Sequence, residues 1–255
     1  MATSRIAFIA SDAAEAQAAH KVLTERYGNA RAADADTIVA LGGDGLMLRV
    51  LHRFVSRGRA IYGMNRGSVG FLMNDFSADD LEARLASAER TTIHPLEMTT
   101  VDDKGRAATG IAFNEVSLLR QIHQAAKLRI HIDGKERLDE LICDGILVAT
   151  PAGSTAYNLS AHGPILPINS PLLALTPISP FRPRRWRGAI IPREAVVEIE
   201  ILEGEKRPVA AVADHVEVRN VRKVRVAEDR SKEVHILFDS GHSLAERVLA
   251  EQFRF

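Results

Sequence analysis

The order of strand-like and helix-like segments in the N-terminal third of the chain constrains the fold most strongly. Apolar segments typical of strands alternate there with helical patterns, in the order 5–10, 13–27, 37–41, 46–57 and 60–64. This β-α-β-α-β order favours a parallel sheet covered by helices, because parallel strands need long crossover connections. Gly28 and Gly58 follow the two helical segments, where helices commonly end. We therefore expect an α/β N-terminal domain over residues 1–94, with a Rossmann-like parallel sheet.

The pattern changes after residue 94. Residues 77–88 still predict a helix, with Ser77 as its N-cap. Beyond residue 94 helical periodicity nearly disappears, and segments rich in β-branched residues are separated by turns. We expect residues 95–232 to form an antiparallel, β-rich C-terminal domain. The last residues, from about 233 to 255, again read as strand, turn and helix, and we expect them to return to the first domain.

The composition narrows the range of partners and compartments. Lysine plus arginine equals aspartate plus glutamate, 33 each, so the formal net charge is zero. A neutral chain has no overall attraction to nucleic acid or to an anionic membrane. Cys143 is the single cysteine, which excludes an internal disulfide, and the apolar run near the start is too short for an export signal. No apolar segment is long enough to span a bilayer. We expect a cytoplasmic protein that binds neither nucleic acid nor membrane.

The turn after the second predicted strand reads Gly42-Gly43-Asp44-Gly45. Glycines at a strand-to-helix turn let a phosphate approach the backbone, and the helix N-terminus favours an anion. Gly42, Gly43 and Gly45 are therefore candidate phosphate-binding residues. Asp44 would repel a phosphate, unless it binds Mg²⁺ that bridges to the phosphates or accepts the proton of an attacking hydroxyl. Both alternatives indicate phosphoryl transfer, whereas a purely structural interpretation makes Asp44 a helix cap.

Two common nucleotide-binding patterns do not fit this turn. A P-loop needs the pattern GxxxxGK followed by serine or threonine, and no such lysine follows these glycines. A dinucleotide-binding fingerprint needs GxGxxG, and neither GGDG nor the later segment GMNRGSVG has that spacing. The charge of a bound triphosphate would then be met by Mg²⁺, backbone N–H groups and an arginine that the sequence does not identify.

Two further segments have polar or glycine-rich patterns. Gly63–Leu72, GMNRGSVGFL, follows the third predicted strand, at the sheet edge where open α/β folds bind ligands. Phe113–Leu119, FNEVSLL, contains adjacent Asn114 and Glu115 in an otherwise apolar, strand-like run. Alternation directs one of them inward, where the hydroxyl or amide groups of a ligand can satisfy it. A connecting turn and a solvent-facing edge strand are the structural alternatives.

The most informative segment is Asp144–Leu166, DGILVATPAGSTAYNLSAHGPIL. A buried strand over 146–149 leads into a loop of small and hydroxyl residues with one aromatic residue, Tyr157. Small residues allow close approach to the backbone, and hydroxyls and an aromatic face suit a nucleotide base and sugar. A flexible Gly/Ser-rich loop, the structural alternative, explains neither the aromatic residue nor the length of the pattern.

Taken in this order, the motifs GGDG, GMNRGSVGFL, FNE and DGILVATPAGSTAYN resemble those of the NAD kinase family. The resemblance covers about Ile38 to His215, together with the C-terminal strand and helix. GGDG alone is shared with diacylglycerol and sphingosine kinases and, more loosely, with phosphofructokinases, whereas the TPAGSTAYN segment is far more specific. The resemblance implies transfer of the γ-phosphoryl of ATP to the 2′-hydroxyl of the adenosine ribose of NAD, which forms NADP. Some bacterial members also use inorganic polyphosphate.

The resemblance also implies roles for individual residues, with Asp44 as the catalytic acid residue at the acceptor hydroxyl. The residues implied to bind NAD are Asp44, Gly45, Phe71, Asn114, Glu115, Asp144, Ala152, Thr155, Ala156, Tyr157, Asn158, Asp214 and His215. The implied cofactors are ATP, as phosphoryl donor, and Mg²⁺ or another divalent cation, for which no ligand set is identified. A homodimer or homotetramer formed through the β-rich domain is implied as well.

Three positions depart from the family pattern. Leu46 follows GGDG where many members have threonine, so a hydroxyl near the phosphates is lost. Ala152 stands where serine or threonine is frequent, and only its backbone can contact adenine. His215 replaces a common glycine.

Other functions stay open at this point. A lipid or other small-alcohol kinase of the same superfamily would share GGDG without needing the GSTAYN segment. A dinucleotide sensor without turnover would not need Asp44 and Glu115. The basic segment 181–188, FRPRRWRG, also fits a nucleic-acid binder, although the neutral chain and its place between β elements favour an exposed or subunit-contacting loop.

Overall fold

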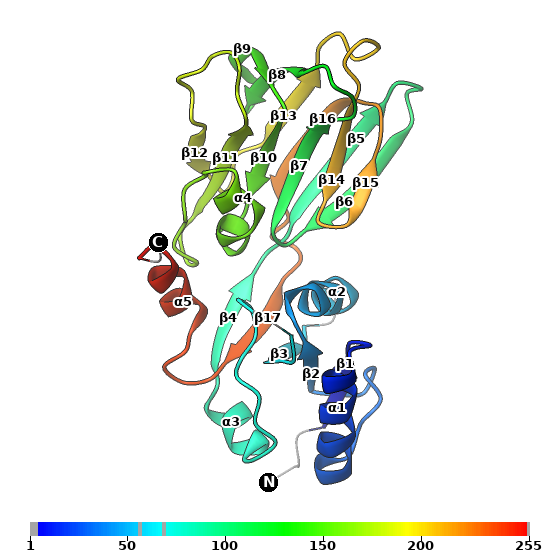
Figure 1. Cartoon of the computed structure of the whole chain (residues 1–255), viewed down its shortest axis with the longest axis vertical. Coiled ribbons are helices and arrows are strands. Elements are labelled where there is room, and N and C mark those ends of the chain that lie inside the picture. Colours follow the sequence, from blue (N-terminus) through cyan, green and yellow to red (C-terminus); the bar gives the residue numbers. More distant parts are fainter. Residues whose placement is uncertain (1–4, 56–57, 68–69, 254–255) are drawn as a thin grey trace. The chain divides into compact units, whose positions relative to one another are not determined.

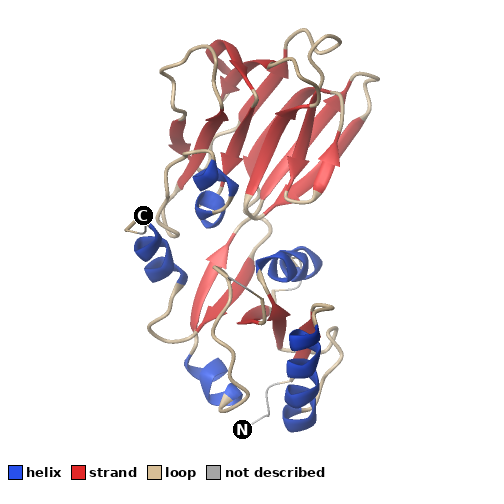
Figure 2. Cartoon of the chain, in the orientation of Figure 1, coloured by secondary structure: helices blue, strands red, loops and turns tan. Residues whose placement is uncertain are grey.

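The computed structural model describes residues 5–55, 58–67 and 70–253, and its elements fall into two units (Figure 1). The first unit combines Met1–Ile93 with Ser231–Phe255, and the second consists of His94–Arg230. The first contains a mainly parallel sheet with helices, whereas the second is dominated by antiparallel strands (Figure 2). The expected fold class, an α/β unit with a β-rich unit, is therefore confirmed.

A five-stranded sheet forms the centre of the first unit. Its order is β1 (Ile6–Ala10), β2 (Thr37–Gly42), β3 (Ala60–Asn65), β17 (Val234–Phe238) and β4 (Glu89–Ile93). The first four strands run parallel, and β4 is antiparallel to β17. Every residue of β2 is buried, which explains its nearly uninterrupted apolar run. The C-terminal strand returns to the first unit as expected, and it inserts between β3 and β4.

The helices of the first unit, within the described residues, are α1 (Ala14–Tyr27), α2 (Asp44–Phe54), α3 (Leu81–Ser87) and α5 (Leu244–Glu251). Ala19 and Leu23 of α1 pack with Phe8, Val39 and Tyr62 of the sheet. These contacts bury the apolar stripe of α1, and burial of such a stripe is the main source of helix stability in proteins.

Two helices begin at other residues than the sequence predicted. α2 begins at Asp44 rather than Leu46, so the acid of the glycine turn lies in the first turn of the helix. α3 begins at Leu81 rather than Ser77. The Ser77 hydroxyl accepts from the Asp79 N–H, so Ser77 stabilises a turn instead of capping the helix. Polar residues that cap helices also form such turns, and periodicity does not separate the two cases.

A buried asparagine joins β17 to its neighbours. The Asn74 side chain donates to the carbonyls of Gly63 in β3 and Leu237 in β17, at 3.0 Å each. It accepts from the Asp239 N–H at 2.9 Å. The Asp239 carboxylate accepts from the Tyr62 hydroxyl at 2.5 Å and from the Arg84 guanidinium at 2.6 Å. These bonds satisfy groups whose burial would otherwise be costly, and they fix the end of β17.

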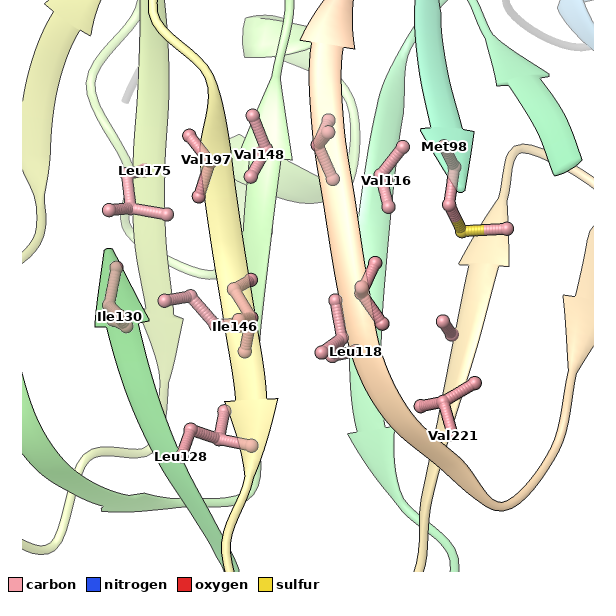
Figure 3. Packing of buried hydrophobic residues seen from close by; sticks show 14 of the residues in the cluster. Met98, Val116, Leu118, Leu128, Ile130, Ile146, Val148, Leu175, Val197 and Val221 are labelled. Carbon is pink, nitrogen blue, oxygen red and sulfur yellow. The ribbon is translucent and has the colours of Figure 1, made fainter. Parts of the chain in front are cut away.

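Two six-stranded antiparallel sheets form the second unit. One has the order β12 (Ala189–Pro192), β11 (Leu172–Ile178), β10 (Gly145–Ala149), β7 (Glu115–Arg120), β14 (Val209–Ala213) and β15 (Val216–Val218). The other has the order β6 (Ala107–Ala112), β5 (Leu96–Asp102), β16 (Val221–Glu228), β13 (Val197–Ile201), β8 (Ala126–Ile132) and β9 (Lys135–Cys143). Side chains of both sheets meet in one core, which includes Met98, Val116, Leu118, Ile130, Ile146 and Val197 (Figure 3).

The segment between β10 and β11 contains two short helices where the sequence predicted a loop. They are the 3-10 helix η1 (Ala152–Thr155) and α4 (Tyr157–Ser160). Helices of this length have little stability of their own, so contacts with the rest of the unit hold them. In the described parts of the chain, every helix is too short or too polar to cross a membrane.

Candidate active site

The glycine turn lies at the carboxyl end of β2. Gly42 is the last residue of β2, Gly43 is the N-cap residue of α2, and Asp44 and Gly45 lie in the first helical turn. A Cβ at Gly42 would meet the Leu46 side chain at 2.9 Å, so Gly42 is required for packing. The first N–H groups of a helix have no carbonyl partner within it, and together with the helix dipole they favour an anion.

The Asp44 carboxylate has partners inside the protein. One oxygen accepts from the Phe71 N–H at 2.7 Å and the other from the Leu72 N–H at 2.9 Å. The dipole of α2 also stabilises a negative charge in this first turn. The acid is therefore held by its own chain, and its bonds go to a separate loop rather than to the helix that it begins. Because a carboxylate offers about four acceptor positions, Asp44 can still bind a hydroxyl or a cation.

Gly45 has no structural reason to be glycine. It is exposed in the first turn of α2, and a Cβ built on it has no heavy atom of the described chain within 4 Å. Glycine at a helical position costs roughly 0.5–1 kcal/mol relative to alanine. Because packing does not require a glycine at Gly45, its presence next to Asp44 indicates that a ligand approaches the backbone there.

The segment Gly63–Leu72 continues from β3 into a turn, and its residues Ser68 and Val69 lie outside the described residues. A Cβ at Gly63 or at Gly70 would come within 2.6 Å of the Met73 side chain, so both glycines are required for packing. This segment meets Asp44 through the backbone of its last two residues. Phe71 itself is half-buried.

Two arginines lie near these motifs in sequence, Arg49 and Arg66, and their surroundings differ. Arg49 is exposed on α2. The Arg66 N–H donates to the Gly42 carbonyl at 2.7 Å, and its guanidinium lies over the Phe76 ring, 3.2 Å from the centroid. The Arg66 Nε is buried and has no hydrogen-bond partner among the described residues. Arg66 is therefore adjacent to the glycine turn and has an unused donor.

In the second unit another aspartate holds a pair of amides. The Asp214 carboxylate accepts from the Phe113 N–H at 2.8 Å and from the Asn114 N–H at 3.1 Å. Asp214 follows β14 with a left-handed φ of 48°. These bonds bring together two of the predicted NAD-binding segments, the Asn114-Glu115 pair and the turn of Asp214 and exposed His215.

Thr150 and Gly153 join the third predicted segment to the same cluster. The Thr150 hydroxyl donates to the Phe113 carbonyl at 2.6 Å, and its N–H donates to the Asn114 carbonyl at 2.9 Å. Gly153 lies so close to Asn114 that a Cβ would come within 2.1 Å of its carbonyl oxygen. Thr150 was not among the predicted site residues, although a hydroxyl residue directly after a buried strand was a usable signal.

The two short helices present the remaining predicted residues of this segment. Thr155 and Ala156 are half-buried, and Tyr157 is 39% exposed, so its ring is accessible. Ala152 is buried, and its carbonyl accepts from the Thr155 hydroxyl at 3.4 Å. Tyr157 therefore offers the aromatic surface that the sequence predicted.

Asn158 is buried and bonded within the protein. Its side-chain amide donates to the Ser154 carbonyl at 3.0 Å and to the Pro164 carbonyl at 2.9 Å, and it accepts from the Thr176 hydroxyl at 2.7 Å. Both amide hydrogens are used, and the residue is fully buried. Its side chain closes the loop through these bonds, and contact of Asn158 with NAD stays a prediction.

Glu115 is the buried acid of the second cluster. Burial raises the pKa of Glu115 from an ordinary value of 4.5 to about 7, and the nearby Asp214 carboxylate contributes to the rise. Its Oε2 is buried and has no hydrogen-bond partner in the described chain. An unsatisfied buried acceptor is costly, which is acceptable where a ligand donates to it.

Within one chain, Asp144 lies apart from the cluster around Asn114, Glu115 and Asp214. It precedes β10, whereas Thr150 follows that strand, and the register pairs Ala149 with Glu115 at the far end. At a strand rise of about 3.3 Å per residue, Asp144 lies roughly 16 Å along the sheet from Glu115. Its carboxylate accepts instead from the Arg120 Nε at 2.6 Å. The structure thus separates Asp144 from the other predicted NAD-binding residues of the second unit.

The basic segment 181–188 contains two aromatic residues, Phe181, which is 48% exposed, and Trp186. Its arginines 182, 184, 185 and 187 are exposed. Trp186, its tryptophan, packs against the apolar core of the second unit. The zero net charge of the chain, rather than the aromatic residues of this segment, argues against nucleic-acid binding.

Comparisons with known proteins agree on one family. The model described as the ATP-NAD kinase N-terminal domain matches residues 3–90, and that of the ATP-NAD kinase C-terminal domain matches residues 113–240. The NAD kinase of Rhizobium meliloti (strain 1021) is 61% identical over 248 residues, which cover 97% of this chain and 96% of that protein. The NAD kinase of Caulobacter vibrioides is 60% identical over 250 residues, with 98% and 96% covered.

Two solved structures share the fold. The crystal structure of yeast NADH kinase complexed with NADH matches 97% of this chain and 86% of that chain, with a TM-score of 0.83 and 20% identity. The structure of an NAD kinase from Archaeoglobus fulgidus in complex with ATP matches 97% and 98%, with a TM-score of 0.78 and 23% identity. At these identities the likeness concerns the fold.

Replacing Gly45 with alanine separates a structural role from a ligand role. We expect Gly45→Ala to raise the free energy of unfolding by about 0.5–1 kcal/mol, because alanine favours the helix and meets open space. We expect phosphoryl-transfer turnover to fall on the order of tenfold, because the methyl group occupies the approach to the backbone. Thermal unfolding and steady-state kinetics measure the two effects. Unchanged turnover in a stabilised variant would contradict a ligand at this position.

Replacing Glu115 with glutamine tests its raised pKa. The folded protein keeps a proton on Glu115 that the unfolded chain releases, so wild-type stability falls as pH rises from about 4.5 to about 7 and is then level. Glutamine has no such proton. The melting temperature of Glu115→Gln minus that of the wild type should therefore increase across this window and stay constant above it.

Thermal melts between pH 4.5 and 8.5 measure this difference. Glu217→Gln removes an exposed carboxylate from β15 in the same unit and serves as the control. A difference for Glu115→Gln that does not vary with pH would show that Glu115 titrates normally.

Proposed function

Since this chain belongs to the NAD kinase family, it is a phosphotransferase that converts NAD to NADP, and we propose how its residues divide this reaction. The family transfers the γ-phosphoryl of ATP to the 2′-hydroxyl of the adenosine ribose of NAD. We assign the acceptor hydroxyl to Asp44, and the dinucleotide to the cluster around Asn114 and Asp214.

The observation that carries this assignment is the fixed orientation of the Asp44 carboxylate. Two amides of another loop hold it at the N-terminus of α2, beside the bare position of Gly45. Phosphoryl transfer passes through a loose transition state, so the acceptor hydroxyl needs orientation more than a strong base. Asp44 accepts a hydrogen bond from the hydroxyl, aligns its oxygen with phosphorus and takes the proton late in the reaction.

ATP is the proposed donor, and Mg²⁺ is the proposed cation. The described residues contain no group of three histidine, cysteine, aspartate or glutamate side chains that could hold a metal ion. Mg²⁺ fits this setting, because it usually binds one or two carboxylates together with the phosphates of a substrate. The unused acceptor positions of Asp44 can supply that carboxylate. When bound, the cation neutralises charge on the transferred phosphoryl group, while Gly43 and Gly45 leave backbone N–H groups open to phosphate oxygens.

The second unit supplies the proposed contacts to NAD. The orphaned Oε2 of Glu115 is suited to a ribose hydroxyl, and the accessible ring of Tyr157 is suited to stacking. Thr155 and Ala156 directly precede Tyr157 in the chain. The turn of Asp214 and His215 is bonded to Asn114, the neighbour of Glu115. Asp214 contributes indirectly, because it holds the backbone of Asn114.

A homo-oligomer is part of the proposal because of Asp144. The family places an aspartate at this position against NAD, yet here it lies at the opposite end of β10 from Glu115. A second copy of the chain can bring its own Asp144 to the first copy's cluster, which one chain cannot do. We expect multi-angle light scattering to give at least twice the 27.9 kDa mass of one chain. A monomer with full activity would contradict this use of Asp144.

A cytoplasmic location agrees with the substrates and with the single cysteine. ATP and NAD are abundant in that compartment. Cys143 is buried, and burial raises the pKa of its thiol to about 12, so it stays a packed, unreactive thiol. We propose no partner other than small-molecule substrates and further copies of the chain.

Replacing Asp44 with asparagine tests the assignment. Asparagine keeps the size of the side chain but cannot accept the hydroxyl proton, and its NH₂ group cannot accept from an amide. We expect turnover to fall roughly 100-fold or more, with NAD binding retained. NADP formed from NAD, ATP and Mg²⁺ is detected with an NADP-specific dehydrogenase, and calorimetry measures NAD binding. Turnover near that of the wild type would overturn the role of Asp44.

The same assay separates the remaining alternatives. NADH in place of NAD tests the acceptor, polyphosphate in place of ATP tests the donor, and a chelator tests the need for a divalent cation. A lipid acceptor phosphorylated in preference to NAD would favour a lipid kinase. Binding of NAD without formation of NADP would favour a sensor.

A further inference from the structure

The loop of residues 70–73 is held from two sides. On one side its Phe71 and Leu72 amides donate to the Asp44 carboxylate. On the other side the Arg247 Nη1 contacts its carbonyls, at 2.6 Å from Met73, 3.3 Å from Phe71 and 3.4 Å from Gly70. The shortest bond, to Met73, is the strongest, and the other two are longer contacts from the same nitrogen. The loop is thus held between a carboxylate and a guanidinium.

Arg247 is itself fixed. It lies on α5, whose Leu244 and Val248 are buried and whose N-terminus is capped by the Ser243 hydroxyl. The Arg247 guanidinium lies over the Phe238 ring, 5.4 Å from its centroid, and its Nε donates to a carbonyl at 3.2 Å. An arginine held by packing on one side has little freedom to follow a moving loop, so it restricts the loop.

The charge of Arg247 also acts on the site. Burial lowers the pKa of Arg247, and the carboxylates of Asp75, Asp44 and Asp239 oppose that effect. Asp44 is therefore close enough to interact with the guanidinium across the loop.

We propose that Arg247 is a positioning residue for phosphoryl transfer, which orients Asp44 through the backbone of residues 70–73. The proposal rests on the proposed function of Asp44. Without the guanidinium the loop gains freedom, and its two amides no longer keep the carboxylate in one direction. Loss of orientation lowers the rate of the chemical step more than it weakens substrate binding.

Arg59 provides a matched control in the same unit. Its guanidinium also donates to two backbone carbonyls, those of Ala32 and Ala33. It precedes β3, whereas Asp44 follows β2, so it lies at the amino end of the parallel sheet and Asp44 at the carboxyl end. Arg59→Gln therefore removes a comparable structural bond without touching the loop of residues 70–73.

The test compares Arg247→Gln with Arg59→Gln in the complete chain. We expect kcat of Arg247→Gln to fall roughly 10- to 100-fold, with KM for NAD changed less than about threefold. Arg59→Gln should keep kcat. Hydrogen exchange of the Phe71 and Leu72 amides should become faster in Arg247→Gln alone. Equal kcat losses in the two variants, or wild-type kcat in Arg247→Gln, would overturn the proposal.

Arg247→Lys covers the case in which Arg247→Gln does not fold. Lysine keeps the charge and can reach one carbonyl, so it should restore part of kcat and part of the amide protection. A Lys variant with wild-type exchange at Phe71 and Leu72 but a full loss of kcat would contradict positioning through the loop.

The double variant Asp44→Asn/Arg247→Gln separates this proposal from the proposed function. If Arg247 acts through Asp44, its replacement should change the residual turnover of Asp44→Asn little, whereas independent effects would add. Wild-type turnover of Asp44→Asn alone would overturn the role of Asp44. Impaired Asp44→Asn together with unaffected Arg247→Gln would overturn the positioning role alone.

Discussion

The bonds from the Phe71 and Leu72 amides to the Asp44 carboxylate are the contact on which the rest of the first unit's site depends. They explain how an acid can occupy a turn suited to phosphate, since two N–H donors and a helix dipole stabilise its charge. They also join the ends of two parallel strands, because Asp44 follows β2 and the loop follows β3. A carboxylate with two oxygens already in fixed bonds directs its remaining lone pairs in fixed directions.

The second unit contains the same arrangement of one aspartate carboxylate bound to two consecutive backbone amides. Asp214 accepts from two consecutive amides, those of Phe113 and Asn114, as Asp44 does from residues 71 and 72. In both places the acid comes at the end of a strand and the amides belong to a loop distant in sequence. A carboxylate can bind two adjacent N–H groups at once, whereas an asparagine can accept from only one side. The two aspartates therefore organise loop backbones in addition to any contact with a substrate.

Local signals made part of this structure predictable. The buried run of β2 and the glycines after it indicated a strand-to-helix turn at Asp44 within two residues of the observed helix start. Ser77 was misjudged as an N-cap because polar residues of loops also bond to their own backbone, and sequence does not separate the two cases. Arg247 gave no signal at all, since its bond to Met73 spans 174 residues. Contacts that depend on the folded arrangement of distant segments carry no local pattern.

β17 lies between β3 and β4 of the first unit, but it follows the whole second unit in sequence. The second unit is therefore synthesised before the sheet of the first unit can be completed. Until β17 emerges, the edges of β3 and β4 lack the strand that pairs with both, and such edges are open to wrong pairing. Asp239 and Arg247 are translated after the second unit, so the loop beside Asp44 gains its support only once these residues have emerged. A nascent chain thus acquires a complete glycine-turn site only after the whole second unit has been synthesised.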